Sequence, residues 1–163
     1  MWRMRGPGRA AVARELFVDT SAWYPIVVRS HADHAELSAE LTALVRAGER
    51  LVTTNLVIAE THALLTIRAG AQTALAFLRY ATTPPTEVVL STPELELEAQ
   101  VAWLTRFADQ AFSLTDAVSF VVMTRRRIRS ALTLNHHFAV AGFSMVPAAV
   151  QPAGTKPPAR RRR

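Results

Sequence analysis

Short apolar runs alternate with longer segments of helical periodicity along most of the chain. The short runs are bounded by polar or turn residues and predict buried strands at 16–19, 50–54, 87–90, 130–134 and 143–147. Apolar residues at helical spacing predict helices at 21–28, 31–48, 55–70, 71–81, 92–109, 113–127 and 135–142. Strands that alternate with helices favour an α/β fold, with helices on both faces of a central parallel sheet of about five strands.

Four polar residues stand beside the predicted strands or inside apolar helical segments. They are three carboxylates and one amide: Asp19, Glu60, Asp116 and Asn135. A buried, unpaired carboxylate is costly, so several in one place favour a site for a hard cation. Asp19 and Asn135 each fall at the end of a predicted strand, and parallel sheets bind ligands beyond the carboxyl ends of their strands. We therefore predict a metal site at that edge of the sheet.

Glu60 is predicted to project from the apolar side of its helix. Leu56 precedes it by four residues, and Leu64 and Ile67 follow it by four and seven, which places them on one helical face. Unpaired acids are rarely fully buried, so this position favours a functional carboxylate. The alternative is a glutamate at the rim of the apolar stripe, paired with an arginine.

The other three positions also have a purely structural interpretation. Asp19 can cap a helix that starts at Ser21, and Asn135 can cap the short helix that follows it. Ser113 and Asp116 have the spacing of a capping box, and an acid in a first turn complements the helix dipole. No single residue decides between a cap and a site, so the predicted site depends on their convergence at one edge of the sheet.

The donor set matches the preference of Mg²⁺ and Mn²⁺ for carboxylate oxygens. Such a cation can lower the pKa of a water and neutralise charge on a phosphoryl oxygen. Asn135 could add only a neutral carbonyl oxygen. Nucleotide-binding glycine loops and the serine hydrolase elbow are absent from the sequence.

Histidines and arginines outside this set are interpreted as supporting groups. His136 and His137 are predicted to make local hydrogen bonds, while His31 and His34 are assigned to a surface helix. The arginine-rich run 125–129 follows a helix end, where it complements the dipole. The alternative is that the arginines of this run bind RNA phosphates.

Composition predicts one folded domain in a reducing compartment. The chain has 163 residues, 50% of them hydrophobic, which is enough for a substantial core. It contains no cysteine, no apolar run of transmembrane length and no recognisable secretory signal. We therefore expect a cytoplasmic protein with no membrane partner.

The net charge of +6 is unevenly distributed. Residues 1–15 carry +3 and residues 151–163 carry +5, which leaves −2 for residues 16–150. These segments define a basic N-terminal extension (1–15), a folded domain (16–150) and a disordered basic tail (151–163). Such ends are expected to attract polyanions. The alternative is a start codon assigned too far upstream and a C-terminal end that only aids solubility.

Four sequence blocks together resemble the PIN-domain ribonucleases, specifically the VapC-type toxins of bacterial toxin–antitoxin pairs. In chain order the blocks are LFVDTSAW, TTNLVIAET, FSLTDAVSF and ALTLNHHFAVAGF. The resemblance extends from about Leu16 to Pro147. It implies that Asp19, Glu60 and Asp116 are metal-binding acids. Asn135 stands where the family usually has a fourth acid, which is a departure from the pattern.

The resemblance also implies a three-layer α/β/α sandwich with strand order 3-2-1-4-5 and a Mg²⁺ cofactor that Mn²⁺ can replace. It implies a homodimer, a cognate antitoxin protein, and a substrate of single-stranded or loop RNA, with tRNA as one possibility. A metal-activated water would attack the RNA phosphate in line, leaving a 5′-phosphate and a 3′-hydroxyl. Asp19, Glu60, Asp116 and Asn135 form the expected catalytic set, with Asn135 as a neutral ligand or supporting group.

Two other functions are compatible with these residues. The first is a catalytically weakened PIN domain that binds RNA or an antitoxin without efficient cleavage, because Asn135 replaces an acid. The second is a metal-dependent phosphatase or phosphotransferase, which the D-T-S sequence after the first strand invites. The chain lacks the D-x-D-x-[TV] nucleophile pattern of such enzymes. An endoribonuclease toxin is therefore the favoured prediction.

Overall fold

The computed structural model describes residues 14–148, which form a five-stranded sheet with all neighbouring strands parallel. The strands are β1 (Glu15–Val18), β2 (Arg50–Thr54), β3 (Thr86–Val89), β4 (Ser130–Leu132) and β5 (Ser144–Val146). Their order is β3-β2-β1-β4-β5, which confirms the α/β sandwich and the strand order that the resemblance implied.

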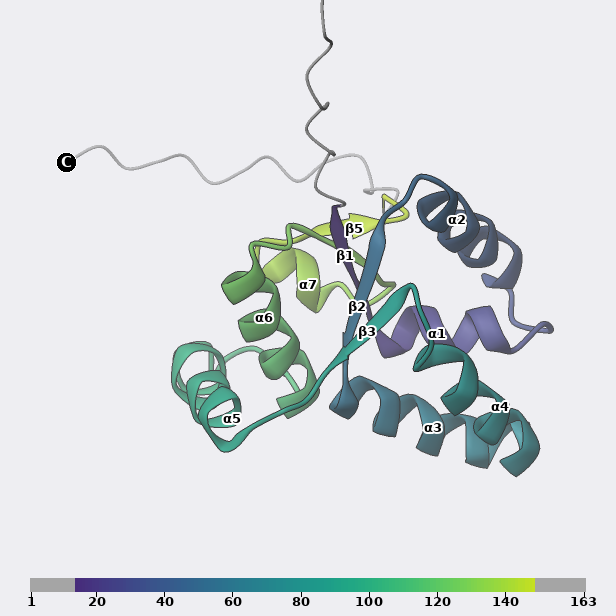
Figure 1. Ribbon diagram of the computed structural model, residues 1–163. Coiled ribbons are helices and arrows are strands. Elements are labelled where there is room, and N and C mark those ends of the chain that lie inside the picture. Colours follow the sequence, from purple (N-terminus) through teal and green to yellow (C-terminus); the bar gives the residue numbers. More distant parts are fainter. Residues whose placement is uncertain (1–13, 149–163) are drawn as a thin grey trace, which may run out of the picture.

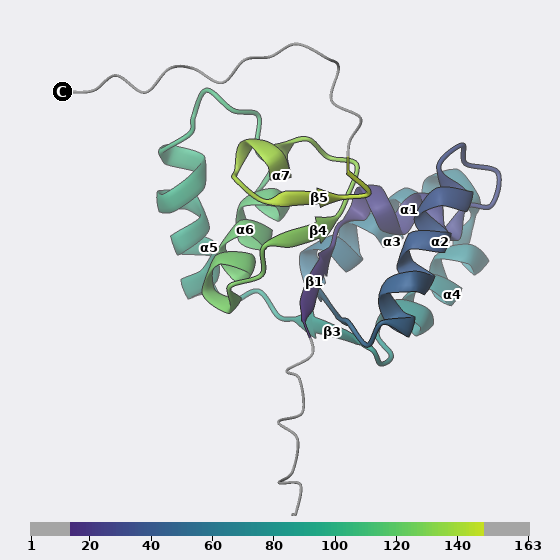
Figure 2. The same ribbon diagram turned by 90° about the horizontal axis from the view of Figure 1, so that it is seen from above.

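Helices cover both faces of the sheet. They are α1 (Thr20–Val27), α2 (His34–Arg46), α3 (Asn55–Ala69), α4 (Ala71–Ala81), α5 (Pro93–Ala99), the π-helix η1 (Gln100–Thr105), α6 (Leu114–Arg126) and α7 (His137–Val140). Figure 1 shows α1 to α4 on one side of the sheet and α5 to α7 on the other, and Figure 2 shows the same layers from above. Parallel strands require such crossovers, because a short turn cannot return the chain to the same end of the sheet.

One predicted helix is interrupted. The sequence pattern predicts a single helix over 92–109, but α5 gives way to the π-helical η1 at Gln100. In η1 the Trp103 ring packs against Phe120, with 5.0 Å between ring centroids, and stacks on Phe107 at 5.5 Å. Periodicity at 3.6 residues per turn does not distinguish this wider turn, because Trp103 and Leu104 still pack against the core.

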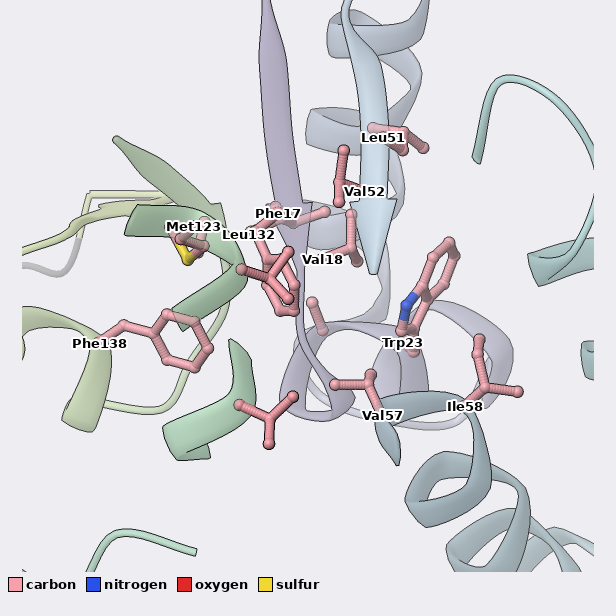
Figure 3. Packing of buried hydrophobic residues seen from close by; sticks show 14 of the residues in the cluster. Phe17, Val18, Trp23, Leu51, Val52, Val57, Ile58, Met123, Leu132 and Phe138 are labelled. Atoms are coloured by element: carbon pink, nitrogen blue, oxygen red, sulfur yellow. The ribbon is translucent and has the colours of Figure 1, made fainter. Parts of the chain in front are cut away.

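The core is divided into two halves by the sheet, and Figure 3 shows side chains from both. On one face Phe17 packs against Phe138, with ring centroids 6.0 Å apart. On the other face the Trp23 ring packs edge-on against Phe77 at 5.9 Å. These four rings are at most 1% exposed. Neighbouring residues in a strand point to opposite faces, so β1 contributes to both halves of the core.

The register of the sheet places two strand ends side by side. In the pairing of β1 with β4, Val18 lies opposite Leu132. The next residue, Asp19, donates its backbone N–H to the Leu132 carbonyl oxygen at 3.1 Å. The chain leaving β1 and the chain leaving β4 therefore emerge together at the carboxyl edge of the sheet, where α1 also begins.

Some predictions concern residues that the structure leaves undescribed. The segments 1–13 and 149–163 lie outside the described range, so the basic extension and the basic tail remain sequence predictions. Strand β1 begins at Glu15, one residue before the predicted domain boundary. Between residues 14 and 148, no helix is long and apolar enough to cross a membrane.

Candidate active site

The four predicted residues line a single hollow at the carboxyl edge of the sheet. The hollow has a volume of about 370 Å³, and Asp19, Glu60, Asp116 and Asn135 all contribute to its wall. They come from the end of β1, from α3, from the first turn of α6 and from the loop after β4. Residues far apart in the chain therefore meet in one place, as the sequence predicted.

Asp19 is both a helix cap and a wall of the hollow. Its Oδ2 accepts hydrogen bonds from the Ser21 backbone N–H at 3.2 Å, the Ser21 hydroxyl at 2.7 Å and the Thr133 hydroxyl at 3.1 Å. Among the described residues, no donor contacts Oδ1. Burial raises the pKa of Asp19, and the nearby charge of Asp116 adds to this effect. The cap fixes one oxygen and leaves the other for a ligand.

Asp116 also has two roles. With Ser113 it forms the predicted capping box: the Asp116 N–H donates to the Ser113 hydroxyl at 3.0 Å, and the Ser113 N–H donates to Asp116 Oδ2 at 3.1 Å. The same Oδ2 lies 3.0 Å from Nδ1 of His137. The cap and the site were alternatives in the sequence, but here they coincide. Because α6 begins at this edge of the sheet, its capping carboxylate also lines the hollow.

Asn135 bridges the loop after β4 to Asp116. Its Nδ2 donates to Asp116 Oδ1 at 3.0 Å, while its Oδ1 accepts the backbone N–H of His137, the first residue of α7, at 3.1 Å. The amide therefore presents its donor side to the carboxylate. A carboxylate in its place would bring two negative charges together, so asparagine suits this contact in the apo protein.

The prediction that Glu60 projects from a buried apolar stripe is wrong. Ile67, which shares its helical face, is 83% exposed, and the buried side of α3 carries Val57, Ile58, Thr61 and Leu65. Glu60 instead points to the open side with Leu64, and both residues line the hollow. The pattern misled because α3 is apolar around much of its circumference, so its period does not identify the covered face.

The charge of Glu60 is coupled to the other acids. Its Oε2 accepts a hydrogen bond from the Thr20 hydroxyl at 3.3 Å. Partial burial raises the pKa of Glu60, and the charges of Asp19 and Asp116 raise it further. These carboxylates therefore act as one electrostatic unit, and a cation that binds among them would relieve their repulsion.

Several residues at the site were not predicted. The Ser21 hydroxyl lies 3.0 Å from that of Thr133 and accepts the Leu134 backbone N–H at 2.8 Å, so it joins the chain after β1 to the chain after β4. His31 was assigned to a surface helix, but it precedes α2 and lines the hollow with Tyr24. The position of His31 depends on how the connection between α1 and α2 folds over the hollow, and no local sequence pattern indicates this.

The donor chemistry of the hollow suits a hard cation. The acidic side chains in its wall are Asp19, Glu60 and Asp116, whose oxygens are the donors that such a cation prefers. The wall also contains His31, whose Nδ1 lies 3.5 Å from Oδ2 of Asp33. Within residues 14–148, no three acidic or histidine side chains converge tightly enough to form a ready-made metal site. The carboxylates instead surround a space, which fits a cation that keeps several of its waters, as Mg²⁺ does.

Comparisons with known proteins agree with this architecture. A model of the PIN domain family matches residues 16–144. The 23S rRNA-specific endonuclease VapC20 of Mycobacterium tuberculosis is 35% identical over 133 residues, which cover 78% of this chain and 95% of that protein. Ribonuclease VapC26 of the same organism is 30% identical over 125 residues, covering 76% of this chain and 89% of that protein.

A solved structure extends the similarity to three dimensions. The crystal structure of Mycobacterium tuberculosis VapC20, described as a Sarcin-Ricin loop cleaving toxin, matches with a TM-score of 0.69 and 31% sequence identity. The match covers 78% of this chain and 95% of the other. The family model and these relatives show that the chain belongs to the PIN domain family.

Proposed function

We propose that this protein is a metal-dependent endoribonuclease and the toxin of a toxin–antitoxin pair. The observation that carries the proposal is the meeting of Asp19, Glu60 and Asp116 around one hollow of about 370 Å³. The relatives of this PIN-domain chain include an endonuclease and a ribonuclease, which supports RNA as the substrate.

Asp19 and Asp116 would hold the cation directly, with Glu60 as a further ligand or as the group that orients a water. When bound there, Mg²⁺ or Mn²⁺ would supply a nucleophile from water and neutralise charge on the phosphoryl oxygens. Asp19 is suited to this role because its Oδ1 has no donor among residues 14–148, while Oδ2 is fixed by Ser21 and Thr133.

Asn135 and His137 would act as positioning residues for Asp116. They contact its two carboxylate oxygens at 3.0 Å each and so limit the rotation of the side chain. Second-layer hydrogen bonds of this kind orient metal ligands. In this proposal the amide of Asn135 aligns an acid instead of supplying one, so cleavage does not require a fourth carboxylate.

A catalytically weakened PIN domain is the second candidate function. The observation that favours it is the contact of Asn135 with Asp116 Oδ1, because this oxygen would otherwise be open to a metal. In such a protein the hollow would bind RNA or an antitoxin without efficient cleavage. The two candidates predict different responses to added metal.

Cleavage assays on total cellular RNA test the proposal. The full-length protein is incubated with EDTA or with increasing Mg²⁺ or Mn²⁺, and the ends of the products are mapped. We expect metal-dependent cuts with 5′-phosphate and 3′-hydroxyl ends, and a lower concentration requirement for Mn²⁺, which binds such ligands more tightly. RNA binding without cutting at any metal concentration would support the weakened domain. Phosphatase turnover without RNA cleavage would contradict both.

The substrate and partners extend the same proposal. The structural relative is described as cleaving the Sarcin-Ricin loop, so structured loop RNA is the first substrate to test here, with tRNA as the second. The proposed regulator is a small antitoxin protein, and the proposed assembly is a homodimer. The proposed location is the cytoplasm, where such RNA is found.

Replacement of Glu60 by glutamine should lower the cleavage rate by roughly 10- to 100-fold at saturating metal, the usual effect of losing a supporting group at a metal site. Glutamine keeps the side-chain length and can still accept the Thr20 hydrogen bond, so the fold should be retained. Single-turnover rates measured over a metal titration separate a ligand from an orienting group. A ligand shifts the metal requirement, whereas an orienting group changes the rate alone. An unchanged rate and metal requirement would remove Glu60 from the site.

A further inference from the structure

A second hollow lies at the amino edge of the sheet, at the opposite strand ends from the acidic hollow. Its volume is about 820 Å³. Its wall contains the arginines Arg14, Arg50, Arg126, Arg127 and Arg129, together with the acids Glu15 and Glu49. In Figure 1 this is the upper end of β1, near the end of α6. We name this feature the amino-edge hollow.

The arginines of the amino-edge hollow fall into two groups. Arg126 is structural: it contacts Glu15 and Glu87 through a set of hydrogen bonds of 2.6–3.0 Å, which joins α6 to β1 and β3. Arg127 and Arg129 are exposed, and neither forms an ion pair with a carboxylate in the described part of the chain. Their charges are therefore available to an anion.

The active site lacks the groups that would hold a polyanion. Within the described residues, the wall of the acidic hollow has three carboxylates and no lysine or arginine. An RNA drawn to that hollow would meet negative charge, apart from the charge of a bound cation. Nucleic-acid affinity comes mostly from lysine and arginine contacts to phosphates. A PIN nuclease with this site needs cationic groups elsewhere, and the amino-edge hollow concentrates them.

One structured RNA molecule is long enough to reach both edges of the sheet. The longest strand, β2, has five residues, which corresponds to roughly 17 Å. An RNA helix, which is A-form, covers such a distance with several base pairs. A stem-loop could therefore have its loop at the acidic hollow while its stem passes the amino edge. A dinucleotide is too short to contact both.

We propose that the amino-edge hollow is a second RNA-binding site, in which Arg127 and Arg129 contact backbone phosphates of a structured substrate at a distance from the cleavage point. This inference rests on the proposed ribonuclease function. Arg127 begins the chain segment after α6 with a left-handed backbone, φ 58°, and this turn directs the following residues along the rim of the hollow. Arg50 and Arg126 are paired with Glu15 and Glu87, so their charges are already partly neutralised.

The test compares Arg127→Gln/Arg129→Gln with Arg79→Gln/Arg106→Gln. The control pair removes the same charge from exposed positions that line neither hollow. Binding of full-length protein to a stem-loop RNA and to a dinucleotide fragment is measured in EDTA over a salt series. Loss of two phosphate contacts should reduce the slope of log K against log salt by roughly 1.5. The stem-loop affinity should fall on the order of tenfold at low salt, and the ratio of stem-loop to fragment affinity should fall with it.

Three results would overturn the proposal. The first is an unchanged salt slope, or a slope equal to that of the control pair. The second is an equal loss for stem-loop and fragment, which would place both arginines at the cleavage site. The third is weaker binding of polyglutamate with no change for RNA, which would indicate an acidic protein partner. If the wild-type protein binds the stem-loop but never cleaves it, the ribonuclease proposal fails while the amino-edge hollow can still pass this test.

Discussion

Replacement of Asp19 by asparagine should lower RNA cleavage by a factor on the order of 10² to 10³. Asparagine retains one carbonyl oxygen, which can keep the hydrogen bonds from Ser21 and Thr133. The other carboxylate oxygen becomes an NH₂ group, which cannot bind a cation. Without the bound cation the transition state loses several kcal/mol of charge stabilisation, and a loss of that size lowers the rate by such a factor. Multiple-turnover cleavage at fixed Mg²⁺ or Mn²⁺ measures it.

The same substitution should make the apo protein more stable at neutral pH. Burial raises the pKa of Asp19 in the folded state above 3.8, so the folded protein binds this proton more tightly than the unfolded chain does. The contribution of this proton to the free energy of unfolding is fully present below the pKa of Asp19 in the unfolded chain. It is lost as the pH rises through the pKa of Asp19 in the folded protein. The amide of the Asp19→Asn variant cannot titrate. Its advantage over wild type should therefore appear at neutral pH and disappear as the pH falls.

Asp109→Asn is the matched control for both measurements. Asp109 is an exposed aspartate that accepts a hydrogen bond from the neighbouring Gln110 side chain and does not line the acidic hollow. It should change neither cleavage nor the pH dependence of apo stability. Melting curves in EDTA from pH 4 to pH 8 test the stability prediction. Full cleavage by Asp19→Asn would contradict its assignment as a metal-binding acid.

Replacement of Asn135 by aspartate should have opposite effects on the apo protein and on the metal-loaded protein. In the apo protein the donor Nδ2, 3.0 Å from Asp116 Oδ1, becomes an oxygen, so a hydrogen bond to a charged group turns into repulsion. The cost should be about 2 kcal/mol, which lowers the melting temperature by roughly 4–8 °C for a chain of this size. With metal present, the added charge should reduce the concentration for half-maximal cleavage by roughly tenfold.

Asn55→Asp provides the control for this substitution, since Asn55 is the only other asparagine in the chain. Its Oδ1 accepts the Ser91 backbone N–H at 2.6 Å, and aspartate retains that oxygen. The Asn135→Asp deficit should shrink in acid, once one of the two carboxyl groups takes up a proton. An unchanged metal requirement would mean that residue 135 only accepts the His137 backbone N–H at the start of α7, which asparagine and aspartate do about equally well, and Asn135 would then be removed from the site.

The sequence alone was sufficient for the order of elements and for placing Asp19 and Asn135 at the carboxyl edge of the sheet. Strands such as β2 are short apolar runs between turn residues, and alternation of strands with helices admits few arrangements besides a covered parallel sheet. Asp19 and Asn135 follow strand ends, and all parallel strands end at the same edge. These predictions use only local pattern and a general rule of topology, so they needed no knowledge of individual contacts.

Only the tertiary structure decided how the side chains of the site face one another. The donor side of Asn135 meets Asp116, Glu60 faces the open side of α3, and His31 reaches the wall of the hollow. The meeting of Arg127 with Arg14 at the amino edge likewise joins residues from distant parts of the chain. Periodicity reports which faces of a helix are apolar, but packing determines which of them another element covers. Contacts between loops depend on where each crossover returns, and that is set by the whole sheet.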